Sequence, residues 1–459
     1  MLNVAPSSTL AVVLLGLCFL LVLGFEVANG FHDSANAVAT VIYTNSLKPR
    51  MAVVWSGIMN FVGVIVGGIA VAYTLVELLP ADVLSPASGS PAIPRLISLF
   101  VTALAWNVLT WWFGIPNSSS HCVIGALIGV AVGSALTNGR GIGHGVDWSQ
   151  VWKVLRALAI SPVLGLVGAG LLYFIVKHVV KDPHLYEPPE GDKPPSWGMR
   201  SLLILTCTSV SFSHGTNDGQ KSIGLIMLTV IGLLPASYAL NPAARDQVQH
   251  PADSARAAAP LIQRYGDDEK GLALEAAQRL QQAQPRLASA ESGDAGSTAT
   301  DADGAGPGGG GQQSPKAATQ SAVRNDVYRL IEQLKEVDRS EQASKEDKTQ
   351  AGKIEGELKP TVEYAPWWVR VLSALCLGVG TMVGYKRIVQ TLGERLGKTH
   401  LTPAQGASAE LVGAGLIATA GFTGLPVSTT HVITSGIAGT MVGSGSGVNR
   451  GMLLRIAGA

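Results

Sequence analysis

Long apolar segments alternate with short polar ones along most of the chain. A helix needs roughly 20 apolar residues to cross the hydrocarbon of a bilayer. The segments that meet or approach this length are 9–31, 51–73, 96–113, 156–176, 202–212 continuing through 222–240, 367–385 and 408–422. We expect membrane-spanning helices rather than a soluble helical protein, because too few polar residues remain to cover a soluble core.

Two shorter apolar runs, 122–136 and 432–443, directly follow turns rich in Ser and Thr. They are short for a full crossing, and we expect each to belong to a re-entrant hairpin. The segment Leu10 to Gly24 has neither the positive start nor the cleavage site of a secretory signal, so we read it as an uncleaved first helix. The expected fold class is an all-α polytopic membrane protein.

Charge is concentrated in one part of the chain. Of the 459 residues, 47% are hydrophobic and 14% are charged, against about 25% charged in ordinary soluble domains. Residues 241–360 hold 15 of the 33 Lys and Arg and 19 of the 32 Asp and Glu. The net charge of +1 gives no electrostatic basis for binding nucleic acid. The four cysteines lie far apart in apolar runs, which indicates neither disulfides nor zinc.

Two pairs of short motifs indicate that the chain holds two copies of one pattern. Residues 29–36 resemble residues 214–221 at an offset of 185. Residues 114–121 resemble residues 424–431 at an offset of 310, with Gly, Pro, three hydroxyl-rich positions and His at the same spacing. The offsets differ by 125 residues, which is the length of the polar segment 241–365. We therefore expect an insert within the second copy.

The expected organisation follows from these offsets. It comprises a first repeat at 1–180, a cytoplasmic linker at 181–200, the first part of a second repeat at 201–240, the insert at 241–365 and the remainder of the second repeat at 366–459. The insert contains a glycine run and Ala/Asp/Ser-rich sequence, so we expect it to be largely disordered with some amphipathic helix. The second copy stops where the first still has a helix, so we expect its last helix to be missing.

Basic loops predict the topology of the two copies. Short loops rich in Lys and Arg favour the cytoplasm, and such loops occur at 48–50, 177–200 and 386–398. Followed helix by helix, the first copy starts outside and the second inside. The copies are thus expected to be inverted, as in many secondary transporters, and the insert to lie outside.

Each copy places an aspartate with amide and histidine neighbours in or beside an apolar helix, where ionisable residues are costly and mark function. The polar residues are Glu26, Asn29, His32, Asp33 and Asn36 in the first copy, and His214, Asn217, Asp218 and Lys221 in the second. A carboxylate with amide oxygens suits a hard cation such as Na⁺ or Mg²⁺, or a proton where burial disfavours charge. The candidates for coupling to a cation or proton are His32, Asp33, His214, Asn217 and Asp218. The alternative is polar packing between helices.

The two Gly-x-Pro turns form a second candidate constellation. Their hydroxyl residues are Ser118, Ser119, Ser120, Ser428, Thr429 and Thr430. A helix N-terminus offers free N–H groups to an oxyanion, and the hydroxyls add donors without fixed charge. Two such tips meeting within the membrane would surround a tetrahedral anion. The alternative is simple capping of two helices, and His121 and His431 are expected to orient the turns.

At these residues the chain resembles the inorganic phosphate transporter family, and within it the bacterial low-affinity phosphate permeases. The segments 111–129, 212–225 and 423–432 carry the resemblance, which extends over nearly the whole chain. The resemblance implies inverted repeats with a re-entrant hairpin in each, a homodimer in the cell inner membrane and no enzymatic activity. It also implies symport of phosphate with protons rather than Na⁺, the phosphate moving largely as a neutral complex with a divalent metal such as Mg²⁺. No resident cofactor is implied, and the metal would arrive with the phosphate.

The family's Asn-Asp pair carries over as Asn217 and Asp218, whereas His32 precedes Asp33 in the first copy. The family's later Asn carries over as Asn36, and Lys221 takes its place in the second copy. A fixed positive charge at Lys221 would replace a bound cation or hold phosphate directly, which favours protons over Na⁺. The substrate-binding residues expected are Asp33, Asn36, Ser118, Ser119, Ser120, Asp218, Lys221, Ser428, Thr429 and Thr430.

Two other functions remain open on the sequence. One is a permease for another oxyanion such as sulfate. The other is a membrane scaffold or sensor that acts through the insert at 241–365. The sequence contains no nucleophile–base pair and no nucleotide-binding loop, so an enzyme is not expected.

Overall fold

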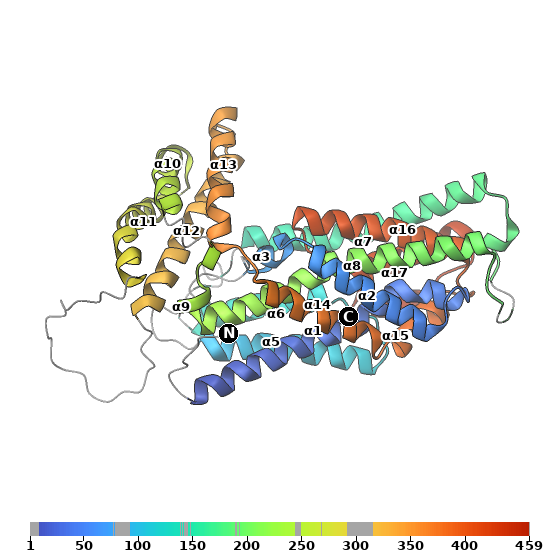
Figure 1. Ribbon diagram of the computed structural model, residues 1–459. Coiled ribbons are helices and arrows are strands. Elements are labelled where there is room, and N and C mark those ends of the chain that lie inside the picture. The colour runs from blue at the N-terminus through green and yellow to red at the C-terminus, as the bar shows by residue number, and fades with distance from the viewer. Residues whose placement is uncertain are drawn as a thin grey trace. The chain divides into compact units, whose positions relative to one another are not determined.

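The computed structural model describes residues 9–76, 78, 92–137, 139, 141, 146, 148–188, 191, 193–243, 249–267, 269–291 and 315–458. These residues are mostly helical, and no β-strand occurs among them (Figure 1). The expected all-α fold is confirmed. The chain divides into two compact units, which we describe separately. The core unit comprises Val13–Val83, Ile93–Leu228 and Ala365–Ala459, and the insert unit contains Thr229–Tyr364.

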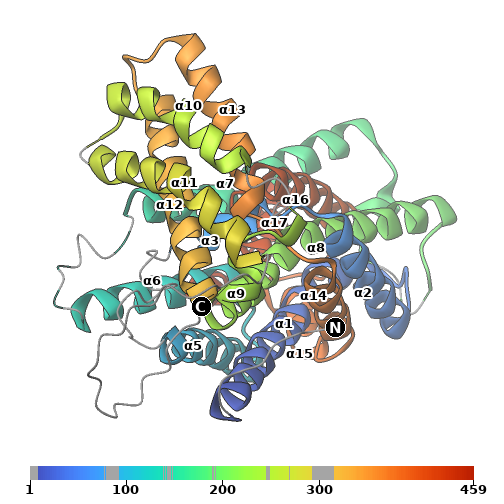
Figure 2. The ribbon, with the colours of Figure 1, turned by 60° about the vertical axis from the view of Figure 1, so that its left-hand side comes forward.

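The core unit consists of helices packed beside one another (Figure 2). Its longer helices are α1 Thr9–Tyr43, α2 Pro49–Val66, α5 Ala92–Trp112, α6 Ser119–Thr137, α7 Trp148–Val179, α8 Trp197–Leu233, α14 Trp367–Met382, α16 Pro403–Thr423 and α17 Thr429–Ser444. Its shorter elements are α3 Ala70–Val76, η2 Pro183–Leu185, α15 Lys386–Gln390, η4 Thr391–Arg395 and α18 Arg450–Ala457. Within the described ranges, five helices are long and apolar enough to cross a membrane, namely α1, α2, α5, α6 and α7.

The helices α1 and α8 carry the first pair of motifs in their interiors. They are 35 and 37 residues long and continue through the motifs without a break. Glu26 of α1 contacts Ser222 of α8, and Asp33, further along α1, contacts His214, which is earlier in α8. The two helices therefore run antiparallel where the motifs meet.

Glycines allow helices of the core unit to approach each other closely. A Cβ atom on Gly439 of α17 would lie 2.0 Å from the carbonyl oxygen of Leu166 on α7. A Cβ on Gly215 of α8 would lie 2.2 Å from the carbonyl oxygen of Asn60 on α2. Real Cβ atoms do not tolerate such distances, so these positions require glycine. The close contacts position α2 beside the motif-bearing α8, and α7 beside α17.

The second pair of motifs forms two similar turns. Gly114, just after α5, has φ +66°, and Gly424, just after α16, has φ +74°. This left-handed backbone favours glycine and ends a helix. Each turn then leads into α6 or α17. We based the expected re-entrant hairpin on the short apolar run 122–136. Helix α6 has 19 residues and is longer than this run, so the re-entrant hairpin remains a prediction.

The insert unit corrects one expectation. We expected 241–365 to be largely disordered, but its described residues form four helices that pack on one another, α10 Gln249–Tyr265, α11 Lys270–Glu291, α12 Pro315–Arg339 and α13 Lys345–Val362. A short helix, α9 Pro235–Tyr238, precedes them. The glycine run at 308–311 lies outside the described residues.

The helices of the insert unit share a hydrophobic core. It includes Ala258, Ile262, Val327, Ile331 and Ile354, all buried. Ala258 and Ile262 of α10 are four residues apart, as are Val327 and Ile331 of α12, which places each pair on one face of its helix. The high content of charged and small residues hid this pattern, because Ala contributes to a core without making a segment strongly apolar. Composition alone was therefore misleading here.

Candidate functional site

A buried polar cluster forms where α1 and α8 cross in the core unit. It contains Asp33 and Asp218, whose side chains are shielded from solvent. The His214 Nε2 atom lies 3.4 Å from Oδ2 of each carboxylate. Because α1 and α8 are antiparallel, aspartates from both copies reach the same place.

The carboxylate of Asp218 has a charged partner. The Lys221 ammonium, also fully buried, donates to Asp218 Oδ2 at 2.6 Å. It donates as well to the Ser120 hydroxyl at 2.6 Å and to the Ser119 hydroxyl at 3.2 Å. Ser119 in turn donates to Asp218 Oδ2 at 3.1 Å. The start of α6 is thereby joined to α8.

The first copy forms an equivalent arrangement around Asp33. The Asn36 amide donates to Asp33 Oδ1 at 2.8 Å and to the Thr430 hydroxyl at 3.3 Å. Thr430 also donates to Asp33 Oδ1. By the repeat offsets, Asn36 corresponds to Lys221 and Thr430 to Ser120. The contact of the carboxylate with the donor and of the donor with the turn hydroxyl therefore occurs twice, whereas the hydroxyl that donates to Asp218 is that of Ser119.

The two Gly-x-Pro turns bind each other reciprocally. The Ser120 hydroxyl donates to the carbonyl of Val427 at 2.7 Å, and the Thr430 hydroxyl donates to the carbonyl of Asn117 at 2.9 Å. Both donors and both acceptors are related by the offset of 310 residues. The helix starts of α6 and α17 consequently meet at the cluster.

Not every hydroxyl of the two turns faces the carboxylates. Ser118 and Ser428 accept from the backbone N–H of His121 at 3.2 Å and of His431 at 3.1 Å, respectively, which is N-capping geometry. Thr429 is buried at the first position of α17. The two histidine rings lie 4.9 Å apart. Both interpretations of the turns therefore apply, to different residues: Ser118 and Ser428 cap helices, whereas Ser119, Ser120 and Thr430 contact the cluster.

The histidines of the first pair of motifs, His32 and His214, have different contacts in the structure. His32 Nε2 donates to the backbone carbonyl of Asn107 on α5 at 2.6 Å, so His32 does not contact the aspartates. His214 does contact them. Asn217 is fully buried next to Asp218 in α8. The coupling candidates brought into one group are thus Asp33, His214 and Asp218.

The orientation of His214 is set by Asn60 of α2. His214 Nδ1 lies 2.7 Å from the Asn60 Oδ1 atom, and the Asn60 amide donates to the Thr381 hydroxyl at 3.0 Å. An amide oxygen only accepts, so Nδ1 carries a proton. Nε2 then faces the two carboxylates either with a second proton or with a lone pair. Asn60 was not predicted from the sequence, although it is a polar residue in an apolar run.

The group Asp33, His214 and Asp218 could hold a cation. Each offers a ligand atom, and these atoms lie within 4.8 Å of one another. Carboxylate oxygens suit Mg²⁺ or Ca²⁺, and an imidazole adds affinity for transition metals. The Lys221 ammonium contacts one of the same carboxylate oxygens. The cluster therefore combines donors that suit an anion with ligand atoms that suit a cation.

Two buried glutamates lie apart from this cluster. Glu26 of α1 was noted in the first motif but not assigned a role. Glu410 of α16 was not noted at all; its Oε2 atom accepts from the Thr206 hydroxyl at 2.5 Å. A glutamate within the apolar run 408–422 was the sequence signal that could have identified it.

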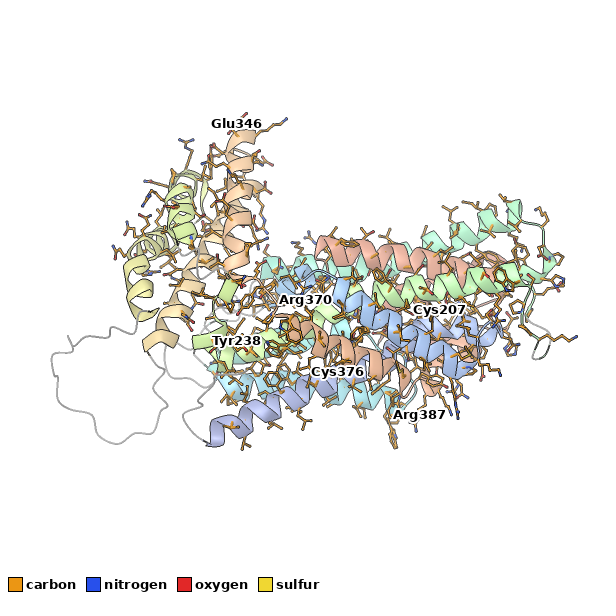
Figure 3. The ribbon with its side chains drawn as sticks, viewed as in Figure 1. Cys207, Tyr238, Glu346, Arg370, Cys376 and Arg387 are labelled. Atoms are coloured by element: carbon orange, nitrogen blue, oxygen red, sulfur yellow. The ribbon has the colours of Figure 1, made fainter. Side chains whose placement is uncertain are left out.

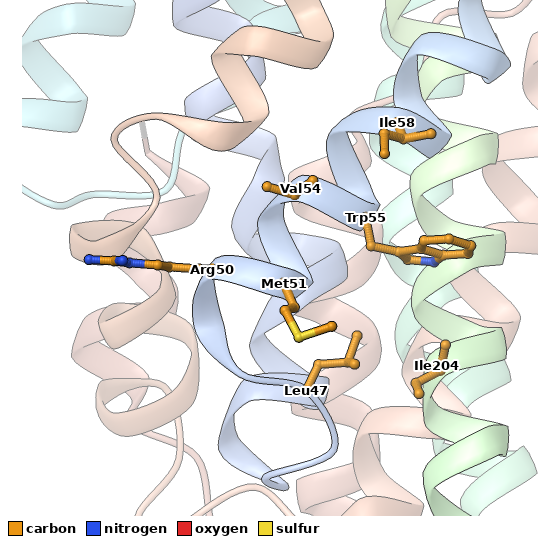
Figure 4. Close-up of a pocket in the computed structure, with 7 residues that line it drawn as sticks. All are labelled: Leu47, Arg50, Met51, Val54, Trp55, Ile58 and Ile204. Carbon is orange, nitrogen blue, oxygen red and sulfur yellow. The ribbon is translucent and has the colours of Figure 1, made fainter.

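A hollow on the surface of the core unit is chemically different. It has a volume of about 450 Å³ and lies between α2 and α8 (Figure 4). Its lining is apolar apart from Arg50 and the Trp55 indole, which donates to Thr208. Such a lining suits hydrocarbon rather than an anion, so we do not assign the substrate to it.

Comparison with known proteins identifies the family of the chain. A model of a family described as "Phosphate transporter family" matches residues 29–459. The chain is 37% identical to the low-affinity inorganic phosphate transporter PitA of Escherichia coli K12, over 95% of this chain and 90% of that protein. It is 27% identical to a probable low-affinity inorganic phosphate transporter of Bacillus subtilis, over 95% and 88%.

One solved structure has a similar fold. It is titled "The sodium-dependent phosphate transporter" and superposes with a TM-score of 0.50. The match covers 97% of this chain and 94% of the other at 19% sequence identity. At this identity the likeness concerns the fold alone.

Proposed function

The chain belongs to the phosphate transporter family, and from this we propose that it is a low-affinity carrier that imports inorganic phosphate together with protons across the cell inner membrane. It is a multi-pass membrane protein and not an enzyme. The observation that carries the proposal is the buried cluster in which both copies contribute a carboxylate, a donor and a turn hydroxyl.

The donors of the cluster suit a phosphate ion. Lys221, Ser119 and Ser120 offer a charged and two neutral donors at the start of α6, where the helix N-terminus also favours an anion. The aspartates add acceptors. HPO₄²⁻ carries a proton that a carboxylate can accept, whereas sulfate carries none at neutral pH. A site with both donors and acceptors therefore favours phosphate over sulfate.

The charges of the cluster support coupling to protons. The Lys221 ammonium already neutralises the Asp218 carboxylate. In the first copy, the neutral Asn36 occupies the position equivalent to Lys221. His214 faces both aspartates and can carry a proton between them. With a carboxylate pair present, a phosphate dianion requires compensating positive charge, which a divalent metal arriving with the phosphate would supply. We therefore include a metal–phosphate complex as the transported species.

The arrangement of the two copies supports alternating access. The antiparallel crossing of α1 and α8 and the reciprocal turn contacts are the contacts that an approximate two-fold relation between inverted copies would produce. Inverted repeats around a central site allow rocking of one part against the other. We propose that the protein works in this way and, by resemblance to its family, as a homodimer.

Phosphate uptake into cells that lack other phosphate transporters tests the proposal. We expect uptake without Na⁺, faster at pH 6 than at pH 8 and stimulated by Mg²⁺, because protons and the metal accompany phosphate. Asp218→Asn and Ser119→Ala should each lower uptake about tenfold or more. Ser209→Ala is the matched control, since its hydroxyl is only half-buried and donates to the Leu205 carbonyl within α8.

The outcomes separate the alternatives. Strict dependence on Na⁺ would exclude proton coupling. Inhibition by sulfate as strong as by arsenate would indicate a general oxyanion permease. Full uptake by both site variants would show that the cluster does not bind substrate.

A further inference from the structure

Glu26 forms a second buried polar site, separate from the cluster at Asp33. Its side chain is fully buried in α1, and it precedes Asp33 by seven residues, about 10 Å along a helix. Its partners come from α1 itself, α8 and α14, three helices that lie together in the core unit (Figure 2). The site therefore links helices from both copies.

The three contacts of the Glu26 carboxylate are all neutral. Oε2 accepts from the Ser222 hydroxyl and from the Asn29 amide, the latter at 3.2 Å. Oε1 accepts from the Ser373 hydroxyl at 3.3 Å. Ser373 also contacts the backbone carbonyl of Gly219 at 3.2 Å.

No cation contacts Glu26 among the described residues. The titratable groups that act on it are Asp218 and His214 on α8. Cys376 on α14, labelled in Figure 3, is a third. Lys221, adjacent to Ser222, donates instead to Asp218. An ionised Glu26 is thus a buried charge without a direct counter-charge, which is unfavourable in such a setting. Binding a proton removes this cost.

We propose that Glu26 is a proton-binding residue of the transport cycle, distinct from the phosphate cluster. This inference rests on the proposed symport with protons. A proton from water on one side binds a carboxylate oxygen of Glu26 and is released to water on the other side, and no other bond changes.

The Glu26 contacts explain how such a proton couples to movement. An ionised carboxylate is stabilised by all three donors, so it favours the arrangement of α1, α8 and α14 seen here. A protonated carboxyl group has lost its charge and depends less on these donors. Protonation therefore permits α1 to move relative to α8 and α14. The aspartates are less suited to this role, because Lys221 and His214 already face them.

Two transport assays on the full-length protein in vesicles test this role. The first is net phosphate uptake driven by a pH gradient. The second is exchange of internal for external phosphate at equal pH, which requires no net movement of protons. We expect Glu26→Gln to lower net uptake about tenfold or more while exchange stays within about twofold of the original protein. Glu26→Asp, which keeps an ionisable group, should retain gradient-driven uptake.

Glu346→Gln is the control, since Glu346 is exposed in the insert unit (Figure 3). It should leave both assays unchanged. Loss of exchange as well as uptake in Glu26→Gln would indicate a structural role and overturn the proposal, as would full gradient-driven uptake by this variant. If uptake by the original protein ignores the pH gradient, the proposed proton symport fails first, and the role of Glu26 fails with it.

Discussion

At the scale of single residues, the charge of the cluster depends on one ion pair. Lys221 and Asp218 are both fully buried, with 2.6 Å between the ammonium and Oδ2. Such a pair contributes little net stability, but removing one member leaves the other charge buried and unpaired. The motif at 214–221 predicted both residues. The structure adds the direct contacts of Lys221 with Ser119 and Ser120, which lie about 100 residues away in the chain.

We expect Asp218→Asn to destabilise the protein as well as to stop transport. Loss of the carboxylate leaves the Lys221 ammonium without its counter-charge, at a cost of about 3–5 kcal/mol. Thermal unfolding of the purified protein should show a clear decrease in Tm.

The double variant Asp218→Asn/Lys221→Met should recover most of this decrease without recovering uptake, because no unpaired charge remains. The exposed pair of Asp253 and Arg256 offers a matched control, and Asp253→Asn should change Tm little. An unchanged Tm in Asp218→Asn would mean that Lys221 is not held by this carboxylate.

At the scale of elements, small residues decide which helices approach closely. The sequence shows small residues at equivalent positions of α6 and α17, but not which of them must be glycine. On α17, a Cβ at Gly439 would meet the Leu166 carbonyl oxygen at 2.0 Å, whereas at Gly443 it would be 3.5 Å from that of Gly170. Of these two glycines, only Gly439 lies where α17 and α7 approach each other most closely.

We therefore expect Gly439→Ala to lower stability by about 1–3 kcal/mol, because the methyl group forces α7 and α17 apart. Gly443→Ala on the same helix should change stability by about 0.5 kcal/mol or less. Tm measurements in detergent compare the two variants directly. Equal effects would show that the two helices do not pack as described.

At the scale of the whole molecule, the insert unit has its own hydrophobic core, and the buried polar cluster belongs to the core unit. The entry and exit of the insert lie close together, since the Asn241 backbone N–H donates to the Thr361 carbonyl at 2.9 Å. The buried Arg324 strengthens this junction by donating to the carbonyls of Ala239 and Val362. A short linker can therefore bridge the ends.

We expect a protein in which a Gly-Ser linker replaces residues 242–360 to keep phosphate uptake within about threefold, because loop length alone costs little. Uptake per inserted molecule is the measurement, with membrane insertion checked separately. A scaffold or sensor acting through the insert would lose its function instead. Complete loss of uptake by a correctly inserted protein would favour that alternative.

The sequence by itself determined the helical class, the two copies and most residues of the cluster. Helical spacing places Asp33 with Asn36, and Asp218 with His214 and Lys221, on one face of their helices, because residues three or four apart are neighbours. The constant offsets identified equivalent turns. The core of the insert unit was missed, because its apolar positions are small and separated by many charges.

Only the tertiary structure decided how the motif residues divide their roles. Consecutive residues of a helix point about 100° apart, so His32 faces α5 while its neighbour Asp33 faces α8. Ser118, which precedes α6, caps this helix, while the first helical residue, Ser119, faces Asp218. The partner that a side chain meets depends on helices far apart in the chain, as in the contact of Asn36 with Thr430. Local spacing carries no information about such partners, and packing alone brings them together.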